Sequence, residues 1–268
     1  MRVSDALVDI GDGLILETRR ISHGSQSDGP VLVFLHESLG NIELWRSFPE
    51  QLAKRTGLDA LVYARPGYGR SSDEPLPRPW NYLEREGAAV LPRLLDVLGI
   101  DEVVLVGHSD GGTIALIAAG TLGARVRALV TMAAHIYADH LTIAGLRAMA
   151  ERYRSTDIRA KLQRYHGART DALFLAWQNI WLDEGFQRSM DFGPWLADIS
   201  CPAMIIQGEA DEYGVPEQVT DIVSAIGDRA QGVFLPDTGH CPHLEKPDRV
   251  RDLICDFLLG PGVQKKHD

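Results

Sequence analysis

One stretch near the middle of the chain decides how the rest is interpreted, and it reads Val103-Val104-Leu105-Val106-Gly107-His108-Ser109-Asp110-Gly111-Gly112-Thr113-Ile114-Ala115. An apolar run of strand length leads directly into the pattern Gly-x-Ser-x-Gly, and a helix-forming segment follows. This order is typical of a nucleophile elbow, a sharp turn that presents a reactive serine above the edge of a sheet. We therefore interpret Ser109 as a candidate nucleophile; the alternative is a serine in an ordinary glycine-rich loop.

The residues around Ser109 fit the geometry of such a turn. Gly107 and Gly111 carry no side chain, so the strand and the helix can pass close together. The helix points its N-terminal amide groups and the positive end of its dipole towards the serine. Because negative charge develops there during acyl transfer, we expect the backbone N–H of Asp110 to be one donor of an oxyanion hole.

Strands and helices alternate outward from this turn. Short apolar runs at 31–35, 58–64, 103–106, 128–133 and 203–207 suit strands buried on both faces of a parallel sheet. Helix-period segments at 43–56, 80–98 and 112–122 lie between them. Two strand-like runs at 6–10 and 14–21 flank an Asp-Gly turn and predict a hairpin. The expected fold class is α/β, with a mostly parallel sheet and an N-terminal antiparallel hairpin.

The alternation stops after residue 134, and residues 135–198 are helix-prone, charged and aromatic. We expect them to form a helical cap, inserted after the sixth strand, over the carboxyl edge where open α/β sheets bind ligands. The alternative is a helical subdomain without a role in substrate binding. A helix at 216–226, a strand at 233–235 and a helix at 243–259 complete the pattern. The chain then consists of an α/β core (1–134 and 199–260), the cap and a flexible tail (261–268).

Segments spread along the chain resemble the α/β-hydrolase superfamily, in the order in which that superfamily carries them. They are Leu35-His36-Glu37-Ser38-Leu39-Gly40, Tyr63-Ala64-Arg65-Pro66-Gly67-Tyr68-Gly69-Arg70-Ser71-Ser72, the serine turn, Ile205-Ile206-Gln207-Gly208-Glu209-Ala210-Asp211 and Leu235-Pro236-Asp237-Thr238-Gly239-His240. The resemblance covers residues 6–259 and points to the capped, single-domain branch of esterases, lactonases and carbon–carbon hydrolases. It implies an α/β-hydrolase fold and a serine-dependent hydrolysis. The segment 65–71 is interpreted as scaffold.

The catalytic acid and base of this superfamily follow the serine in that order. The resemblance places the acid at Asp211, three positions after Gly208 and just past an apolar strand. Glu209 and Glu212 are nearby alternatives. The base is placed at His240, after the last strand. A serine hydroxyl needs a base to take its proton, and a carboxylate fixes the tautomer of that base.

The chain departs from the superfamily pattern at Glu37, where a glycine is expected after His36. Carried over by position, the second oxyanion donor is the backbone N–H of Ser38, with Leu39 as the alternative. The string Ser38-Leu39-Gly40 is similar to strings in enol-lactonases of dicarboxylate degradation, which favours lactone hydrolysis. Glu37 itself is interpreted as a solvated loop charge, and a substrate contact is the alternative.

Composition limits the classes of partner. The formal net charge of −10 disfavours anionic nucleic-acid backbones and anionic lipid surfaces, so a small molecule is the expected partner. Three cysteines, Cys201, Cys241 and Cys255, give no disulfide framework, although a Cys201–Cys241 bridge stays open. The first residues lack the features of a secretory signal, so we expect a cytoplasmic protein. His240 and His243 lack the Glu or Cys ligands that would complete a metal site, so we expect neither metal nor cofactor.

The sequence therefore predicts a serine hydrolase that cleaves a small carboxylic ester or a lactone through an acyl-enzyme on Ser109. One alternative is hydrolysis of a carbon–carbon bond in a ring-cleavage diketone. Another is a hydrolase-fold protein that binds a ligand without turnover. The elbow holds serine and not aspartate, which disfavours the alkyl-enzyme route of related dehalogenases and epoxide hydrolases. The oligomeric state stays open.

Overall fold

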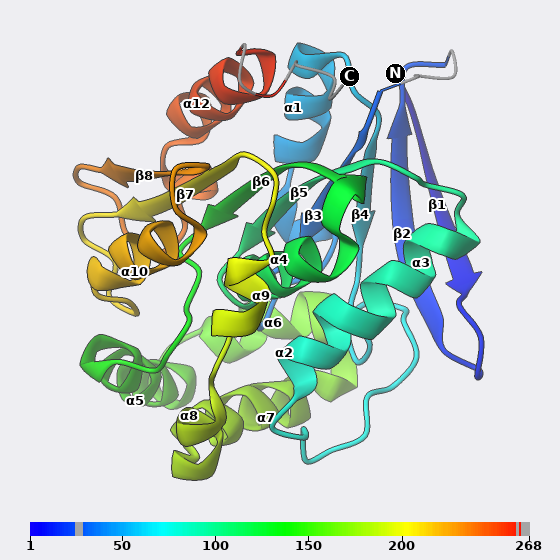
Figure 1. Cartoon of the computed structure of the whole chain (residues 1–268). Helices are drawn as coiled ribbons and strands as arrows, with labels where there is room; N and C mark the ends of the chain where they lie inside the picture. The colour runs from blue at the N-terminus through cyan, green and yellow to red at the C-terminus, as the bar shows by residue number, and fades with distance from the viewer. Residues whose placement is uncertain (25–28, 261–262, 264–268) are drawn as a thin grey trace.

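The computed structural model describes residues 1–24, 29–260 and 263, and one eight-stranded sheet forms its centre (Figure 1). The spatial order of the strands is β1-β2-β4-β3-β5-β6-β7-β8. The strands are β1 (Arg2–Asp9), β2 (Ile15–Ser22), β3 (Val31–Leu35), β4 (Ala60–Tyr63), β5 (Val103–His108), β6 (Val126–Met132), β7 (Ala203–Gly208) and β8 (Ala230–Leu235). From β4 to β8 in this order, neighbours pair in parallel, whereas β2 pairs antiparallel with both β1 and β4.

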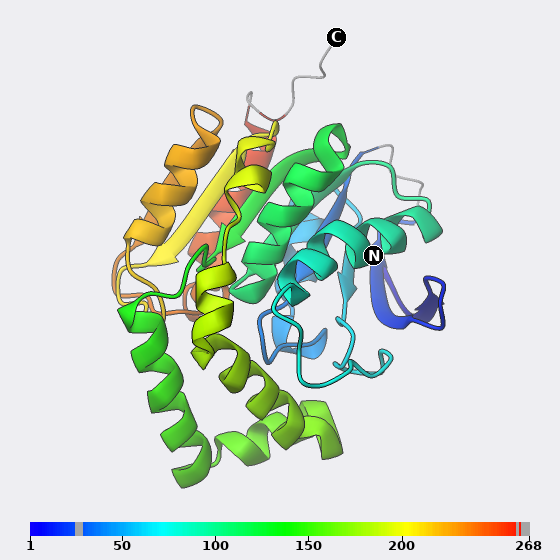
Figure 2. The ribbon, with the colours of Figure 1, turned by 60° about the horizontal axis from the view of Figure 1, so that its bottom comes forward.

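Helices cover both faces of the sheet (Figure 2). The helices are α1 (Phe48–Thr56), α2 (Tyr82–Arg85), α3 (Leu91–Val97), α4 (Asp110–Leu122), α5 (His140–Ser155), α6 (Ile158–His166), α7 (Thr170–Leu182), α8 (Glu184–Ser189), α9 (Gly193–Ala197), α10 (Glu217–Ile226), α11 (Pro242–Glu245) and α12 (Pro247–Leu259). Leu32 and Phe34 of β3 face α1 and α12, while Val33 and Leu35 face the cluster that contains α3, α4 and α10. Because β3 is buried on both faces, its sequence is a continuous apolar run.

The chain between β6 and β7 forms helices α5 to α9 and no strand. In Figure 1, helices α5 to α8 lie beyond one end of the sheet, below the strands. The expected fold class is confirmed: a mostly parallel sheet, an antiparallel N-terminal hairpin and a helical insertion after the sixth strand. The tail predicted at 261–268 lies, except for Val263, outside the described residues.

Three predicted helices are interrupted in the structure. The segment expected at 43–56 divides into a 3-10 turn, Glu43–Trp45, and α1. The segment expected at 243–259 divides into α11 and α12, with Lys246 between them at φ −131° and ψ 57°. A proline disfavours the helical conformation of the residue before it, and it fits the first turn of a new helix, so Pro247 explains the break. The segment expected at 80–98 contains a π-helical turn, Glu86–Val90, between α2 and α3.

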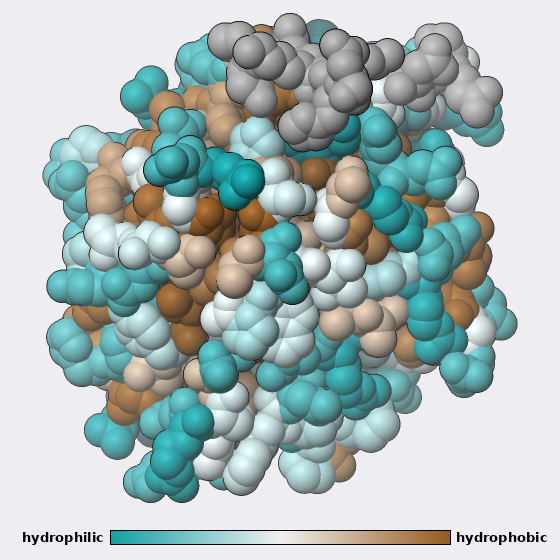
Figure 3. Space-filling view, in the orientation of Figure 1, coloured by the Kyte–Doolittle hydropathy of each residue, from teal (hydrophilic) through white to brown (hydrophobic). Residues whose placement is uncertain are grey.

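In Figure 3, hydrophilic residues cover most of the visible face and hydrophobic residues form smaller patches between them. Over the described part of the chain, no helix combines the length and the apolar character needed to cross a bilayer.

A group of buried charges lies beneath the serine turn, between β4 and the helices α2 to α4. Arg65 and Asp110 are 2% and 1% exposed, and the Arg65 guanidinium lies 3.6 Å from the Asp110 carboxylate. Glu86 is 7% exposed, and within the described residues its Oε2 atom has no hydrogen-bond partner. Burial disfavours the ionised carboxylate and raises the pKa of Glu86 to about 7, although nearby Arg65 acts in the opposite direction.

The serine turn is packed so tightly that glycine is required on both sides. A Cβ atom on Gly107 would overlap the carbonyl oxygen of Gly111, and a Cβ on Gly111 would overlap the carbonyl oxygen of Leu35. Both obstacles are backbone atoms, which cannot rotate away as a side chain can. The close approach of β3, β5 and α4 therefore depends on these glycines.

The change Gly111→Ala tests this packing. We expect the free energy of unfolding to fall by about 3 kcal/mol, because the added methyl group forces backbone atoms apart. Gly193→Ala is the control, since its Cβ would meet only the Asp191 carboxylate at 3.3 Å; it should change stability by less than about 1 kcal/mol. Urea denaturation measures both, and equal midpoints for the two variants would contradict the packing argument.

The buried Glu86 predicts a pH-dependent stability. The pKa of Glu86 is about 7 in the folded chain and ordinarily 4.5, so the folded state holds the proton more tightly. The contribution of Glu86 to the free energy of unfolding is therefore largest below pH 4.5. As the pH rises towards 7, the free energy of unfolding falls by about 3 kcal/mol. Glu86→Gln should remove this loss, whereas the exposed-site control Glu184→Gln should not. Denaturation curves at pH 5 and pH 8 measure it; a wild-type loss that persists in Glu86→Gln would be the contrary result.

Candidate active site

Ser109 occupies a strained turn between β5 and α4, with a backbone φ of 52°. Residues other than glycine rarely adopt this conformation, so the surrounding contacts must hold it. The Ser109 N–H donates to the Met132 carbonyl (2.9 Å), and the Ser109 carbonyl accepts from the N–H groups of Gly112 (2.7 Å) and Thr113 (3.1 Å). The structure thus places Ser109 at the strand-to-helix turn that the sequence predicts.

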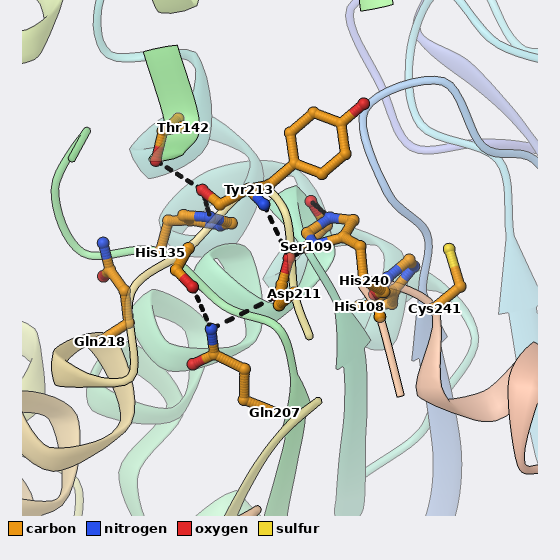
Figure 4. Close-up of polar contacts among 12 residues, drawn as sticks. His108, Ser109, His135, Thr142, Gln207, Asp211, Tyr213, Gln218, His240 and Cys241 are labelled. Carbon is orange, nitrogen blue, oxygen red and sulfur yellow. Dashed lines mark hydrogen bonds and ion pairs between the residues drawn. The ribbon is translucent and has the colours of Figure 1, made fainter. Parts of the chain in front are cut away.

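The hydroxyl of Ser109 lies against the imidazole of His240, which lies against the carboxylate of Asp211 (Figure 4). The distance from Ser109 Oγ to His240 Nε2 is 3.0 Å, and that from His240 Nδ1 to Asp211 Oδ1 is 2.9 Å. A carboxylate can only accept, so His240 Nδ1 carries the proton and Nε2 is free to accept from the serine hydroxyl. Residues 109, 211 and 240, far apart in the sequence, form one chain of hydrogen bonds.

The environment of Asp211 keeps its carboxyl group ionised. Asp211 is 6% exposed, and it accepts from the Tyr213 N–H (2.9 Å) and from the Gln207 amide (3.4 Å). Burial alone raises the pKa of Asp211, but the interactions with His240 and Tyr213 outweigh it and lower the pKa below its ordinary value. Of the alternative acids, Glu209 is exposed and Glu212 lies at the pocket without a hydrogen bond to His240.

His240 is positioned by the loop that follows β8. Its backbone carbonyl accepts from the Nε2–H of His108 (2.8 Å), the residue just before the serine. The His240 ring lies 4.7 Å from the Tyr213 ring and 5.2 Å from the His108 ring, between centroids. The His240 side chain is 14% exposed. Protein atoms therefore enclose the imidazole on most sides, and its exposed part faces the pocket.

Residues 32–253 match the alpha/beta hydrolase family, which is most of the chain. The chain belongs to this family. The match includes Ser109, Asp211 and His240, together with the strands that precede them.

Several characterised hydrolases are similar to this chain. The human serine hydrolase BPHL is 28% identical over 200 residues, which cover 72% of the chain and 66% of BPHL. A 2-hydroxy-6-oxononadienedioate/2-hydroxy-6-oxononatrienedioate hydrolase of Klebsiella pneumoniae is 26% identical over 268 residues, which cover 90% of the chain and 91% of that enzyme. The crystal structure of the enol-lactonase from Burkholderia xenovorans LB400 superimposes with a TM-score of 0.74 at 18% identity, over 95% of the chain and all of the lactonase.

The extent of these matches differs between relatives. The chain spans 37%, 66% and 91% of the lengths of three curated relatives that it matches. The structural likeness, at 18% identity, establishes the fold. The hydrolase family is therefore established.

Both predicted oxyanion donors line the same pocket as Ser109. Asp110 is the first residue of α4, so its N–H belongs to the helix end that has no intrahelical acceptor. The turn that carries Ser38 is held by hydrogen bonds to the residue before it. The Glu37 carbonyl accepts from His36 Nδ1–H (2.7 Å) and from Arg65 Nη2 (2.9 Å). The roles of the Ser38 and Asp110 amides stay predictions.

Glu37 is not the solvated loop charge that the sequence suggests, and this interpretation is wrong. Its side chain is 27% exposed, and one carboxylate oxygen lies 3.6 Å from Nδ1 of His108. The carboxylate folds over Gly40, where a Cβ atom would collide with it. The interactions with His108 outweigh the effect of burial and lower the pKa of Glu37 to about 2. Glu37 also lines the pocket, so the alternative of a substrate contact stays a prediction.

The pocket has a volume of about 300 Å³ and opens above the serine. The α/β core contributes Ser109 and His240 to its wall. The helical insertion contributes apolar side chains and one cation, namely Leu146, Met149, Arg152, Trp177 and Trp181. Such a volume suits a small, partly apolar molecule.

Tyr82, which the sequence does not predict as a site residue, connects the insertion to the serine turn. Trp181 Nε1–H, on α7, donates to the Tyr82 hydroxyl (3.0 Å), and this hydroxyl donates to Asp110 Oδ2 (2.8 Å). Tyr82 is 3% exposed. No local pattern around residue 82 signals this role, because both partners are distant in the sequence.

The change Tyr82→Phe should loosen Asp110 and leave the Trp181 N–H without an acceptor. We expect a loss of about 1–3 kcal/mol of stability, the usual cost of unpaired buried polar groups. The rate of acyl transfer should fall more than KM rises, because Asp110 is an oxyanion candidate. Tyr137→Phe is the matched control, since the Tyr137 hydroxyl donates to the exposed Asp221 at the same 2.8 Å. Urea denaturation and steady-state kinetics measure both variants; similar losses in both would contradict the proposed link.

Proposed function

We propose that this chain is a serine hydrolase that cleaves a small carboxylic ester or a lactone through an acyl-enzyme on Ser109. The observation that carries the proposal is the pair of short contacts, 3.0 Å from Ser109 Oγ to His240 Nε2 and 2.9 Å from His240 Nδ1 to Asp211 Oδ1. A hydroxyl, an imidazole and a carboxylate in this order are the groups that serine hydrolysis requires.

The proposed reaction has two halves. Ser109 Oγ attacks the acyl carbon while His240 Nε2 takes the hydroxyl proton, and Asp211 stabilises the imidazolium that forms. The N–H groups of Ser38 and Asp110 donate to the oxyanion of the tetrahedral intermediate. His240 then gives its proton to the leaving oxygen. A water molecule, activated by the same imidazole, hydrolyses the acyl-enzyme and restores Ser109.

We further propose that residues 135–198 act as a cap over the α/β core (1–134 and 199–260). Support comes from the side chains of Leu146, Met149, Trp177 and Trp181, which line the pocket together with Ser109. These side chains would select a partly apolar acyl or alcohol group and would exclude water from it. The partner is then a small molecule, and a reducing, cytoplasmic location agrees with three free cysteines.

A second candidate is hydrolysis of a carbon–carbon bond next to a carbonyl group. The similarity to the Klebsiella dienedioate hydrolase over most of both chains favours it. The likeness to the enol-lactonase favours lactone cleavage, and the human serine hydrolase supports a reaction that uses a serine. Both chemistries would use the same serine, histidine and oxyanion donors, so the substrate decides between them.

The change Ser109→Ala should abolish turnover. With p-nitrophenyl acetate as substrate, we expect kcat/KM to fall by about 10⁴-fold, and Asp211→Asn should lose a similar factor. Glu209→Gln, in the same loop as Asp211 but exposed, should keep the wild-type rate. Activity that survives Ser109→Ala would reject the serine mechanism.

A substrate panel then assigns the bond. p-Nitrophenyl esters, lactones and ring-cleavage diketones are compared by kcat/KM on the wild-type chain, and the proposal expects the highest value for an ester or a lactone. Preference for the diketone would support the second candidate. A fluorophosphonate probe distinguishes an enzyme from a binding protein, since only an activated Ser109 is labelled covalently.

A further inference from the structure

A second chain of polar groups leads into the same pocket and ends on a thiol. Cys241 follows His240 directly, lines the pocket and is partly exposed, whereas Cys201 and Cys255 are buried. All three cysteines are free thiols. Figure 4 shows the Cys241 side chain beside the ring of His108. The proposed hydrolysis makes no use of this thiol.

His108 stands between the Cys241 thiol and the Glu37 carboxylate. It is 1% exposed, and its Nε2 atom is occupied by the carbonyl of His240 at 2.8 Å. Its Nδ1 atom has no hydrogen-bond partner among the described residues and lies 3.6 Å from Glu37 Oε2. Burial alone lowers the pKa of His108, but Cys241 and Glu37 outweigh it and raise the pKa well above its ordinary value. A neighbouring imidazole, His243, is held uncharged, because burial and His108 lower its pKa.

The order Cys241, His108, Glu37 resembles the order Ser109, His240, Asp211, with a thiol in place of the hydroxyl. A carboxylate holds an imidazole, and the imidazole lies beside a nucleophile that opens into a pocket. A positive charge beside a thiol stabilises the negative charge that develops on the sulfur as it attacks. Cys201 is different because it is buried: burial raises the pKa of its thiol to about 12, in spite of nearby Arg229, and buried structural cysteines are inert.

We propose that Cys241 is a second nucleophile of the pocket, which captures soft carbon electrophiles of the α,β-unsaturated carbonyl class with the help of His108 and Glu37. In this addition the Cys241 sulfur bonds to the β-carbon, and the carbon–carbon π pair moves to the α-carbon. The thiol gives its proton to water, the His108 imidazolium donates a proton to the α-carbon, and a proton from water restores His108. No group leaves, and neither oxidant nor reductant is needed. The inference goes beyond the hydrolase reaction.

The adduct would stand beside the serine chain. Cys241 and Ser109 line one pocket of about 300 Å³, so a group bonded to Cys241 would occupy space that a substrate needs. It would also lie next to His240, whose carbonyl is held by His108. Capture of an electrophile would therefore inhibit the hydrolase, which makes Cys241 a covalent control point.

N-ethylmaleimide, an unsaturated imide of this class, is the probe. The folded chain is treated with less than one equivalent, and the modified cysteine is identified by peptide mass spectrometry. We expect Cys241 to be labelled first, at a second-order rate about tenfold or more above that of glutathione at the same mildly acidic pH. A rate equal to or below that of glutathione, or faster labelling of Cys201 or Cys255, would overturn the proposal.

Variants separate the parts of the cluster. Glu37→Gln should slow the labelling of Cys241 by about tenfold, because the imidazolium loses its carboxylate partner. Glu212→Gln is the matched control: this carboxylate lines the same pocket without an ion pair to His108, so labelling should keep its rate. Equal labelling rates in the two variants would contradict the proposed role of Glu37. Circular dichroism establishes that each variant is folded before labelling.

Inhibition is measured as the fraction of each variant's own untreated esterase rate. The wild-type chain should lose most of its rate on labelling, and Cys241→Ser should keep its own rate under the same treatment. Ser109→Ala should still be labelled at Cys241 as fast as the wild type. Labelling without any esterase activity would therefore contradict the hydrolase proposal alone, and esterase activity without selective labelling would contradict the thiol proposal alone.

Discussion

The contact between the Ser109 hydroxyl and the His240 imidazole, 3.0 Å long, is the interaction on which the rest of the site depends. It requires that loops after β5, β7 and β8 meet at one edge of the sheet. These strands belong to a parallel array, so their carboxyl ends point the same way and their loops are neighbours. Glycines at 107 and 111 let β5 and α4 approach closely enough to raise the serine above that edge.

The serine turn is supported by a buried polar layer that extends into the helical insertion. Asp110 accepts from Tyr82 and lies near Arg65, and Tyr82 in turn accepts from Trp181 of α7. Charges in such a place are stable only when they are paired or hydrogen-bonded, because water is excluded. The helix end proposed to stabilise the oxyanion is therefore connected by hydrogen bonds to the helical insertion, which contributes side chains to the pocket.

The departure at Glu37 has a structural compensation. A glycine at 40 leaves room for the carboxylate, and His108 supplies a positive partner for it. His108 also holds the backbone of His240, so the substitution connects the oxyanion turn to the loop of the base. A residue that departs from the family pattern is thus part of the support of the site, next to the thiol of Cys241.

The elements with local signals could be predicted from the amino-acid sequence: the hairpin around an Asp-Gly turn, the apolar strands, the helical insertion, and the strand–serine–helix turn. The sequence also placed Asp211 and His240 in loops after strands, through resemblance to a known family. Three features emerge from the folded chain alone: Glu37 pairs with His108, Tyr82 links Trp181 to Asp110, and a thiol shares the pocket. These contacts join residues far apart in the chain and depend on how helices pack on the sheet, for which no periodicity or spacing in the sequence gives a signal.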